Sequence, residues 1–240
     1  MLPELPPKDV EAPLEAHLAE LRGRLLVVVL VILLLSMGAF TVTDRVILIL
    51  KKDLLQEGVR LVALNPLDYL MARAKLAVVA ALVVGTPVII YEVFKFISPG
   101  LFPTEERFLV TVVPVSLVLF LLGAVFSYTI LTPRSVQYLI TYSGGVAIPM
   151  LVLGKFIGFI SFMLLSFGLI FQIPLLLYLS VRGGVVRLED LRGKRRYVYA
   201  ALIGGSVLIS PDPTPITPLI VAFALAAVFE LSLFVMGRLL

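Results

Sequence analysis

The segment YEVFKFISPGLFPTEERF (Tyr91–Phe108) joins two long apolar runs and resembles neither of them. It combines aromatic residues, a Pro-Gly pair typical of a turn, and two adjacent carboxylates. A connection between two helices needs only a few residues to turn the chain. These additional features therefore indicate a binding surface, while the apolar runs on its two sides determine the fold.

Apolar residues make up 60% of the 240 residues, and the mean hydropathy is +1.09. Soluble domains contain about 45–50% apolar residues, so this composition indicates an integral membrane protein. Cysteine is absent and His17 is the only histidine, which excludes disulfides, thiolate metal sites and histidine clusters. The net charge of +4 is spread over short loops and does not predict nucleic-acid binding. No cofactor or metal is expected.

A bilayer core of about 30 Å requires about 20 helical residues, and six apolar runs meet or approach this length. The predicted spans are residues 25–43, 74–94, 109–131, 156–179, 197–210 and 219–236. The fifth run would reach only about 21 Å, but a basic loop precedes it and a proline-rich turn follows it. The sequence predicts one all-α polytopic membrane domain over residues 1–240, kinked where Pro87, Pro114 and Pro174 lie inside spans.

The orientation of the chain follows from the loop 182–196. Its end, RGKRRY (Arg192–Tyr197), holds four cations, and short basic loops usually face the cytoplasm. Alternation of the spans then places both termini and the loop 95–108 on the cytoplasmic side. That side carries 12 of the 20 lysines and arginines.

Several sequence blocks, met in order along the chain, resemble the TatC family, the multi-spanning subunit of the twin-arginine protein translocase. They are HLAELRGRLL (17–26), GTPVIIYEVFKFISPGLFPTEERF (85–108), FGLIFQIPLLLY (167–178), LEDLRGKRRYV (188–198), LISPD (208–212) and VFELSLF (228–234). The resemblance implies a glove-shaped protein of six spans with cytoplasmic termini. It also implies a receptor for the twin-arginine signal peptides of folded cargo, and no enzymatic activity.

The resemblance further implies a location in the cell membrane and a set of partners. These are single-span subunits of the TatA/TatB type and further copies of the chain itself, with export driven by the proton gradient. The alternative is a small-solute secondary transporter, for which kinked spans and intramembrane polar residues are also expected. The chain shows no internal repeat and few mid-membrane charges, which favours the translocase.

Glu20 and Glu105 are the predicted ligands of the arginine pair, and Phe96 is the aromatic residue of the same loop. Carboxylates bind guanidinium groups in bidentate geometry, so a receptor for two consecutive arginines needs carboxylates at a fixed spacing. The match to the TatC motifs favours this role. The alternative is that both are ordinary carboxylates near helix starts, solvated or paired with Arg22 or Arg107.

Glu106 and Arg22 belong to the same motifs but support two interpretations each. Many relatives carry a base at the position of Glu106, so this carboxylate either strengthens arginine capture or offsets Arg107. Arg22 either contributes to the site or marks the cytoplasmic end of a span.

Gln172 is predicted to lie in the middle of the fourth span, where relatives often carry a glutamate. A charged group there costs about 2.5–3.5 kcal/mol and usually marks a function, whereas a glutamine often links helices. The amide makes proton relay at this position doubtful. It leaves partner contact and packing within the chain equally open.

Two further acidic residues are candidate partner contacts. Glu230 lies about 6 Å of helix from the cytoplasmic end of the sixth run, where it either contacts a partner or reaches toward Arg238 or the Arg195-Arg196 pair. Asp212 matches the family in the outer turn, but Ile216 stands where relatives carry a polar residue.

Overall fold

The computed structural model describes residues 14–55, 58–97, 105–143, 150–182, 184, 186–209 and 216–239. The elements in chain order are α1 (Leu14–Phe40), α2 (Thr43–Leu54), β1 (Arg60–Val62), α3 (Pro66–Ile97), α4 (Glu105–Phe126), the π-helical turn η2 (Ser127–Leu131), α5 (Thr132–Ser143), β2 (Met150–Val152), α6 (Leu153–Ile170), α7 (Ile173–Arg182), α8 (Leu188–Gly193), α9 (Arg195–Ile209) and α10 (Ile216–Leu239).

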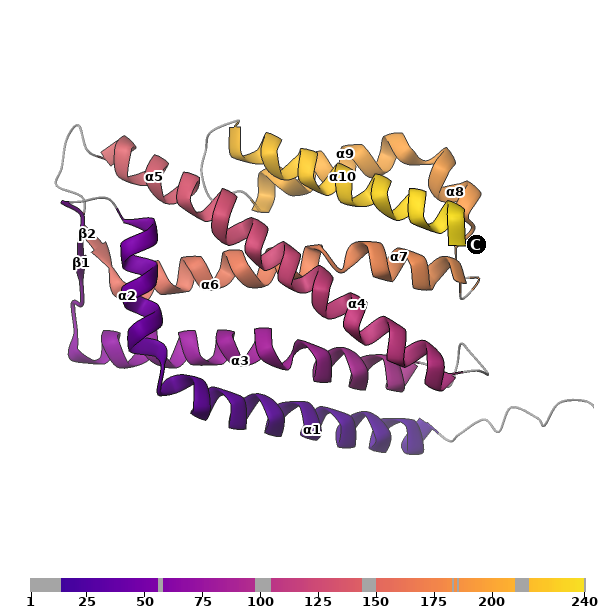
Figure 1. The fold of residues 1–240 in the computed structure, drawn as a ribbon, viewed down its shortest axis with the longest axis horizontal. Helices are drawn as coiled ribbons and strands as arrows, with labels where there is room; N and C mark the ends of the chain where they lie inside the picture. Colours follow the sequence, from indigo (N-terminus) through magenta and orange to yellow (C-terminus); the bar gives the residue numbers. More distant parts are fainter. Residues whose placement is uncertain are drawn as a thin grey trace, which may run out of the picture.

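The structure confirms a helical multi-pass membrane protein. Five helical segments of the described chain are long and apolar enough to cross a bilayer: His17–Phe40, Pro66–Val93, Val112–Thr141, Leu153–Arg182 and Thr217–Arg238. The remaining predicted span corresponds to α9, whose 15 residues reach about 22 Å. Helix α9 lies beside α10 (Figure 1). The count of six spans is consistent with this arrangement and stays a prediction.

The first predicted span ends earlier in the structure than the sequence indicated. Helix α1 ends at Phe40, three residues before the predicted end of the span at Thr43, and Thr43 already opens α2. Arg73 of α3 fixes this turn, because its Nη2 donates to the Phe40 carbonyl at 3.1 Å and its Nε lies 2.9 Å from Asp44 Oδ1. The Phe40 carbonyl also accepts a hydrogen bond from Thr43 Oγ1 at 2.8 Å, so side chains of α2 and α3 together satisfy this acceptor at the end of α1.

The fourth predicted span is interrupted rather than continuous. Pro174 has no N–H to donate to the carbonyl of Ile170, and its ring crowds the preceding turn. The backbone accordingly tightens one turn earlier, where Gln172 N donates to Leu169 O at 2.9 Å, and α7 starts at Ile173. The expected kink is confirmed here, while α3 and α4 run on through Pro87 and Pro114.

The third predicted span is longer than expected. Helix α4 continues without a break through the π-helical turn into α5, which ends at Ser143, well beyond the predicted end at Leu131. A π-helical turn inserts one extra residue into a helix and shifts the face that follows it. This shift buries Leu131, Val136 and Ile140, so the chain continues as a packed helix.

Helix α6 forms the centre of the packing. It contacts α3 on one side and α4 on the other, and it lies behind α4 in Figure 1. Its side chains Ile157 and Ile160 belong to the core shared with α2, α3 and α5, while Met163 and Phe167 pack with η2 and α10. Helix α1 lies outside this core, packs along α3, and leaves leucines such as Leu34 exposed, as lipid contact requires.

The two ends of the bundle differ. At the left end of Figure 1, α2 crosses the helix ends, and β1 pairs in parallel with β2 through Leu61 and Leu151. At the right end lie the start of α1, the end of α3, the start of α4, the end of α7, helix α8 and the end of α10. The described helix ends that border the segments predicted to be cytoplasmic are therefore gathered at one end of the molecule.

Candidate functional site

An ionic and aromatic cluster lies at this right-hand end, between the first turns of α1 and the last turns of α3. His17, Glu20 and Arg24 follow one another at intervals of three and four residues, so they share one face of α1. Glu92 and Phe96 share a face of α3 for the same reason. Because α1 packs along α3, the two faces meet.

Arg24 joins two carboxylates across the two helices. Its Nε donates to Glu20 Oε1 at 3.0 Å, its Nη2 contacts the same oxygen, and its Nη1 donates to Glu92 Oε2 at 3.3 Å. The side chains of Arg24 and Glu92 are 16% and 15% exposed, whereas that of Glu20 is 38% exposed. The cluster therefore holds a guanidinium in place and presents one carboxylate to solvent.

Phe96 lies one turn beyond Glu92 and forms the aromatic part of the cluster. The ring of His17 stacks on it, with centroids 4.4 Å apart and an angle of 21° between the planes. Stacked rings at this distance fix the positions of both side chains. The stack lies next to the Glu20–Arg24–Glu92 network, so aromatic and carboxylate groups form one continuous surface.

Three other predicted residues belong to helix starts at this end of the bundle. Arg22 is exposed on α1. Glu105 and Glu106 form the first turn of α4, which starts at the same end of the bundle as the cluster. The side chains of these two glutamates lie outside the described part of the structure, so their predicted role stays a prediction.

Glu92 was missed by the sequence interpretation. It lies within the quoted segment, but only its distance of four residues from Phe96 indicated that the two share a face. Arg24 was likewise not among the predicted site residues, because basic residues at span ends are ordinary topology markers. Their contact became visible only through the packing of α1 on α3.

Gln172 lies at the break between α6 and α7 and links this break to α4. Its Oε1 accepts a hydrogen bond from Ser116 Oγ at 2.6 Å, and its Nε2 donates to Ser116 O at 3.0 Å. Both residues are buried. The amide thus satisfies polar groups at a point where the helix is interrupted inside the predicted membrane region.

Replacing Gln172 with leucine is expected to destabilise the protein by about 1 kcal/mol, because hydrogen bonds between buried helices contribute this much on average. Thermal unfolding in detergent measures the effect. In a double-mutant cycle, Ser116→Ala should cost little once Gln172 has been replaced. Gln137→Leu, at an exposed position of α5, is the matched control, and an equal loss there would contradict the assignment.

Of the two acidic residues predicted as partner contacts, the structure describes Glu230 but not Asp212. Glu230 of α10 accepts a hydrogen bond from Tyr199 Oη and lies 3.4 Å from Arg195 Nη2, so it pairs with α9. Its predicted direction toward the Arg195-Arg196 pair agrees with this contact. Asp212 lies outside the described residues.

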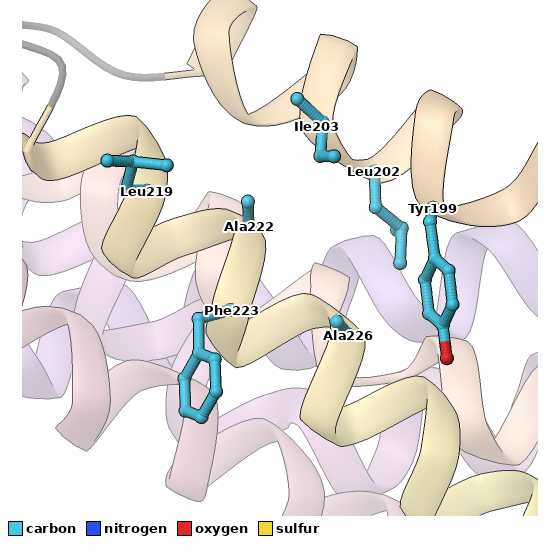
Figure 2. A pocket seen from close by; sticks show the side chains of 7 residues that line it. All are labelled: Tyr199, Leu202, Ile203, Leu219, Ala222, Phe223 and Ala226. Atoms are coloured by element: carbon cyan, nitrogen blue, oxygen red, sulfur yellow. The ribbon is translucent and has the colours of Figure 1, made fainter. Parts of the chain in front are cut away.

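An apolar pocket of about 400 Å³ lies between α9 and α10 (Figure 2). Tyr199, Leu202 and Ile203 of α9 line one side, and Leu219, Ala222, Phe223 and Ala226 of α10 line the other. The hydroxyl of Tyr199 is the polar side-chain group of this lining. Such a surface suits hydrocarbon rather than a polar solute.

The chain is similar to known proteins both in sequence and in fold. Residues 16–223 match the family model described as Sec-independent protein translocase protein (TatC). The TatC protein of Methanocella arvoryzae is 36% identical over 229 residues, and that of Aquifex aeolicus is 33% identical over 233 residues; each match covers 95% of both chains. A crystal structure described as the twin-arginine translocase receptor TatC superposes with a TM-score of 0.77 at 31% identity, covering 93% of this chain and 98% of that one.

Proposed function

Because this chain belongs to the TatC family of Sec-independent protein translocases, we propose that it is the subunit that receives twin-arginine signal peptides. The family resemblance predicted from the sequence is confirmed. TatC is a translocase component and not an enzyme, and the matches give no support to a small-solute transporter. The whole chain, residues 1–240, forms the functional domain in this proposal.

The Glu20–Arg24–Glu92 network is the observation that supports this function. Its carboxylates already hold one guanidinium, which is the group that a twin-arginine peptide would present. Glu20 is the more exposed carboxylate and can be reached from solvent. We place the first arginine at Glu20 and the second at Glu105 in the first turn of α4, with Phe96 beside them and Glu106 and Arg22 at the periphery.

The receptor surface faces the cytoplasm in this proposal, and the chain resides in the cell membrane. The basic connection formed by α8 and the start of α9 lies at the same end of the bundle as the cluster (Figure 1). Basic connections of this length stay on the cytoplasmic side. A signal peptide would therefore meet the cluster before its cargo crosses the membrane.

After signal-peptide binding, the chain recruits single-span subunits of the TatA/TatB type and further copies of itself, and the proton gradient drives export. Family membership supports this step. Glu230 pairs with Tyr199 and Arg195 of α9 within the chain, so we assign it to the contact between α9 and α10. Gln172 directs its amide to α4, and we assign it to packing.

The full chain in detergent is expected to bind an immobilised twin-arginine signal peptide at least about tenfold more tightly than a twin-lysine version. The reason is that an ammonium group cannot reproduce the bidentate contact of a guanidinium with a carboxylate. A photo-crosslinker next to the arginine pair should label the region of Phe96. Equal binding of both peptides, or labelling confined to the opposite end of the bundle, would contradict the proposal.

A further inference from the structure

We propose that Glu92 is a positioning residue for twin-arginine recognition, which retains Arg24 when the signal peptide takes Glu20. In the free chain, Arg24 occupies the position of an incoming arginine and bridges both carboxylates. On binding, the peptide guanidinium replaces Arg24 at Glu20, and Arg24 stays with Glu92. This inference rests on the proposed function of the same site.

The geometry of Arg24 permits this exchange. A guanidinium offers five N–H donors in a rigid plane. Nε and Nη2 face Glu20, while Nη1 faces Glu92 from another edge of the plane. The contact with Glu92 can therefore persist after the contact with Glu20 is lost.

The difference in exposure determines which contact is exchanged. Arg24 and Glu92 are 16% and 15% exposed, so their ion pair lies mostly within the contact between α1 and α3. Charges removed from water require a partner, and breaking such a pair is costly. Glu20 is more exposed, which makes it the carboxylate that a peptide can reach and that water can solvate during the exchange.

The charges of the cluster support the same role. Two carboxylates and one guanidinium leave one negative charge for an incoming arginine. Without Glu92, Arg24 would neutralise Glu20, and the peptide would have to compete with a cation held permanently nearby at a high effective concentration. The neighbouring Lys95 lies over the Tyr91 ring, with its Nζ 5.4 Å from the ring centroid, and His17 lies on Phe96. Both groups also interact electrostatically with Glu20, but neither contacts both carboxylates as Arg24 does.

The experiment compares the dissociation constants of a synthetic twin-arginine signal peptide for the full chain in detergent. Glu92→Gln should weaken binding about tenfold, since Arg24 then blocks Glu20. In the Arg24→Gln background, the same substitution should change the affinity by less than about twofold, because no cation is left to hold. Glu92→Asp keeps the charge and should retain most of the affinity. Glu189→Gln, at an exposed position of α8, is the matched control and should bind normally.

The Arg24→Gln background distinguishes a positioning role of Glu92 from direct contact with the peptide and from a role in folding. If Glu92 touched the peptide directly, or only supported the fold, the loss would be equal in both backgrounds, and the proposal would be overturned. An unchanged affinity of a folded Glu92→Gln variant would overturn it as well. If Glu20→Gln also bound normally, the receptor site itself would be wrong, whereas a loss in Glu20→Gln with normal Glu92→Gln would remove only the role of Glu92.

Discussion

Replacing Glu20 with glutamine is expected to weaken the binding of a twin-arginine signal peptide about 30-fold, equivalent to about 2 kcal/mol. Glutamine keeps the size and the hydrogen-bonding capacity of the side chain but removes its charge. A neutral amide cannot accept two charge-assisted hydrogen bonds from one guanidinium. In this variant Arg24 is expected to pair with Glu92 alone, so the contact between α1 and α3 remains. Titration of a labelled peptide into the full chain in detergent measures the effect.

Two comparisons make the Glu20 result specific. Glu105→Gln should weaken binding as well, because the proposed site needs a carboxylate for each arginine, whereas Glu189→Gln should leave it unchanged. The unfolding temperatures of the Glu20→Gln and Glu189→Gln variants should lie close to that of the parent chain, since carboxylates that are partly or fully exposed contribute little to stability. Normal affinity of both Glu20→Gln and Glu105→Gln would place the arginine pair elsewhere on the protein.

The helical architecture could be predicted from the sequence because a bilayer imposes a length on every apolar run. The boundaries of the helices could not be predicted from the apolar runs. Helix α1 begins at Leu14 in a polar segment, since helical hydrogen bonds continue where apolar composition ends. Its end at Phe40 depends on Arg73, which arrives from α3 and is 33 residues away in the chain.

The candidate site could likewise be predicted only in part. Glu20 and Phe96 could be identified from the sequence because they lie in local motifs, and the structure places them in one cluster. The bridge from Arg24 to Glu92 joins residues 68 positions apart. It depends on how α1 and α3 are aligned along each other, which no local pattern determines. The hydrogen bonds of Gln172 likewise depend on the crossing of α4 over α6, since Ser116 is 56 positions away.

The crossing of α4 over α6 is closely packed, and it depends on two glycines. A Cβ atom added to Gly123 would lie 2.9 Å from both the Phe167 carbonyl carbon and Phe171 Cβ, and would meet the Phe167 carbonyl oxygen as well. A Cβ at Gly168 would lie 2.6 Å from the ring of Phe120. Small residues allow the backbones of membrane helices to approach in this way. The two sites differ, however, because a ring can turn aside and a backbone carbonyl cannot.

Gly123→Ala is therefore expected to destabilise the protein by about 3 kcal/mol, the upper part of the range for overpacked cores. The methyl group would force α4 away from α6 and would also separate Ser116 from Gln172. Gly168→Ala should cost less, because Phe120 can adjust. Gly158→Ala, also on α6, meets nothing within 4 Å and should be neutral or stabilising by up to about 1 kcal/mol, as alanine favours helix. Thermal unfolding in detergent provides the ranking, and equal stability of the Gly123 and Gly158 variants would show that the two helices do not cross as closely as described.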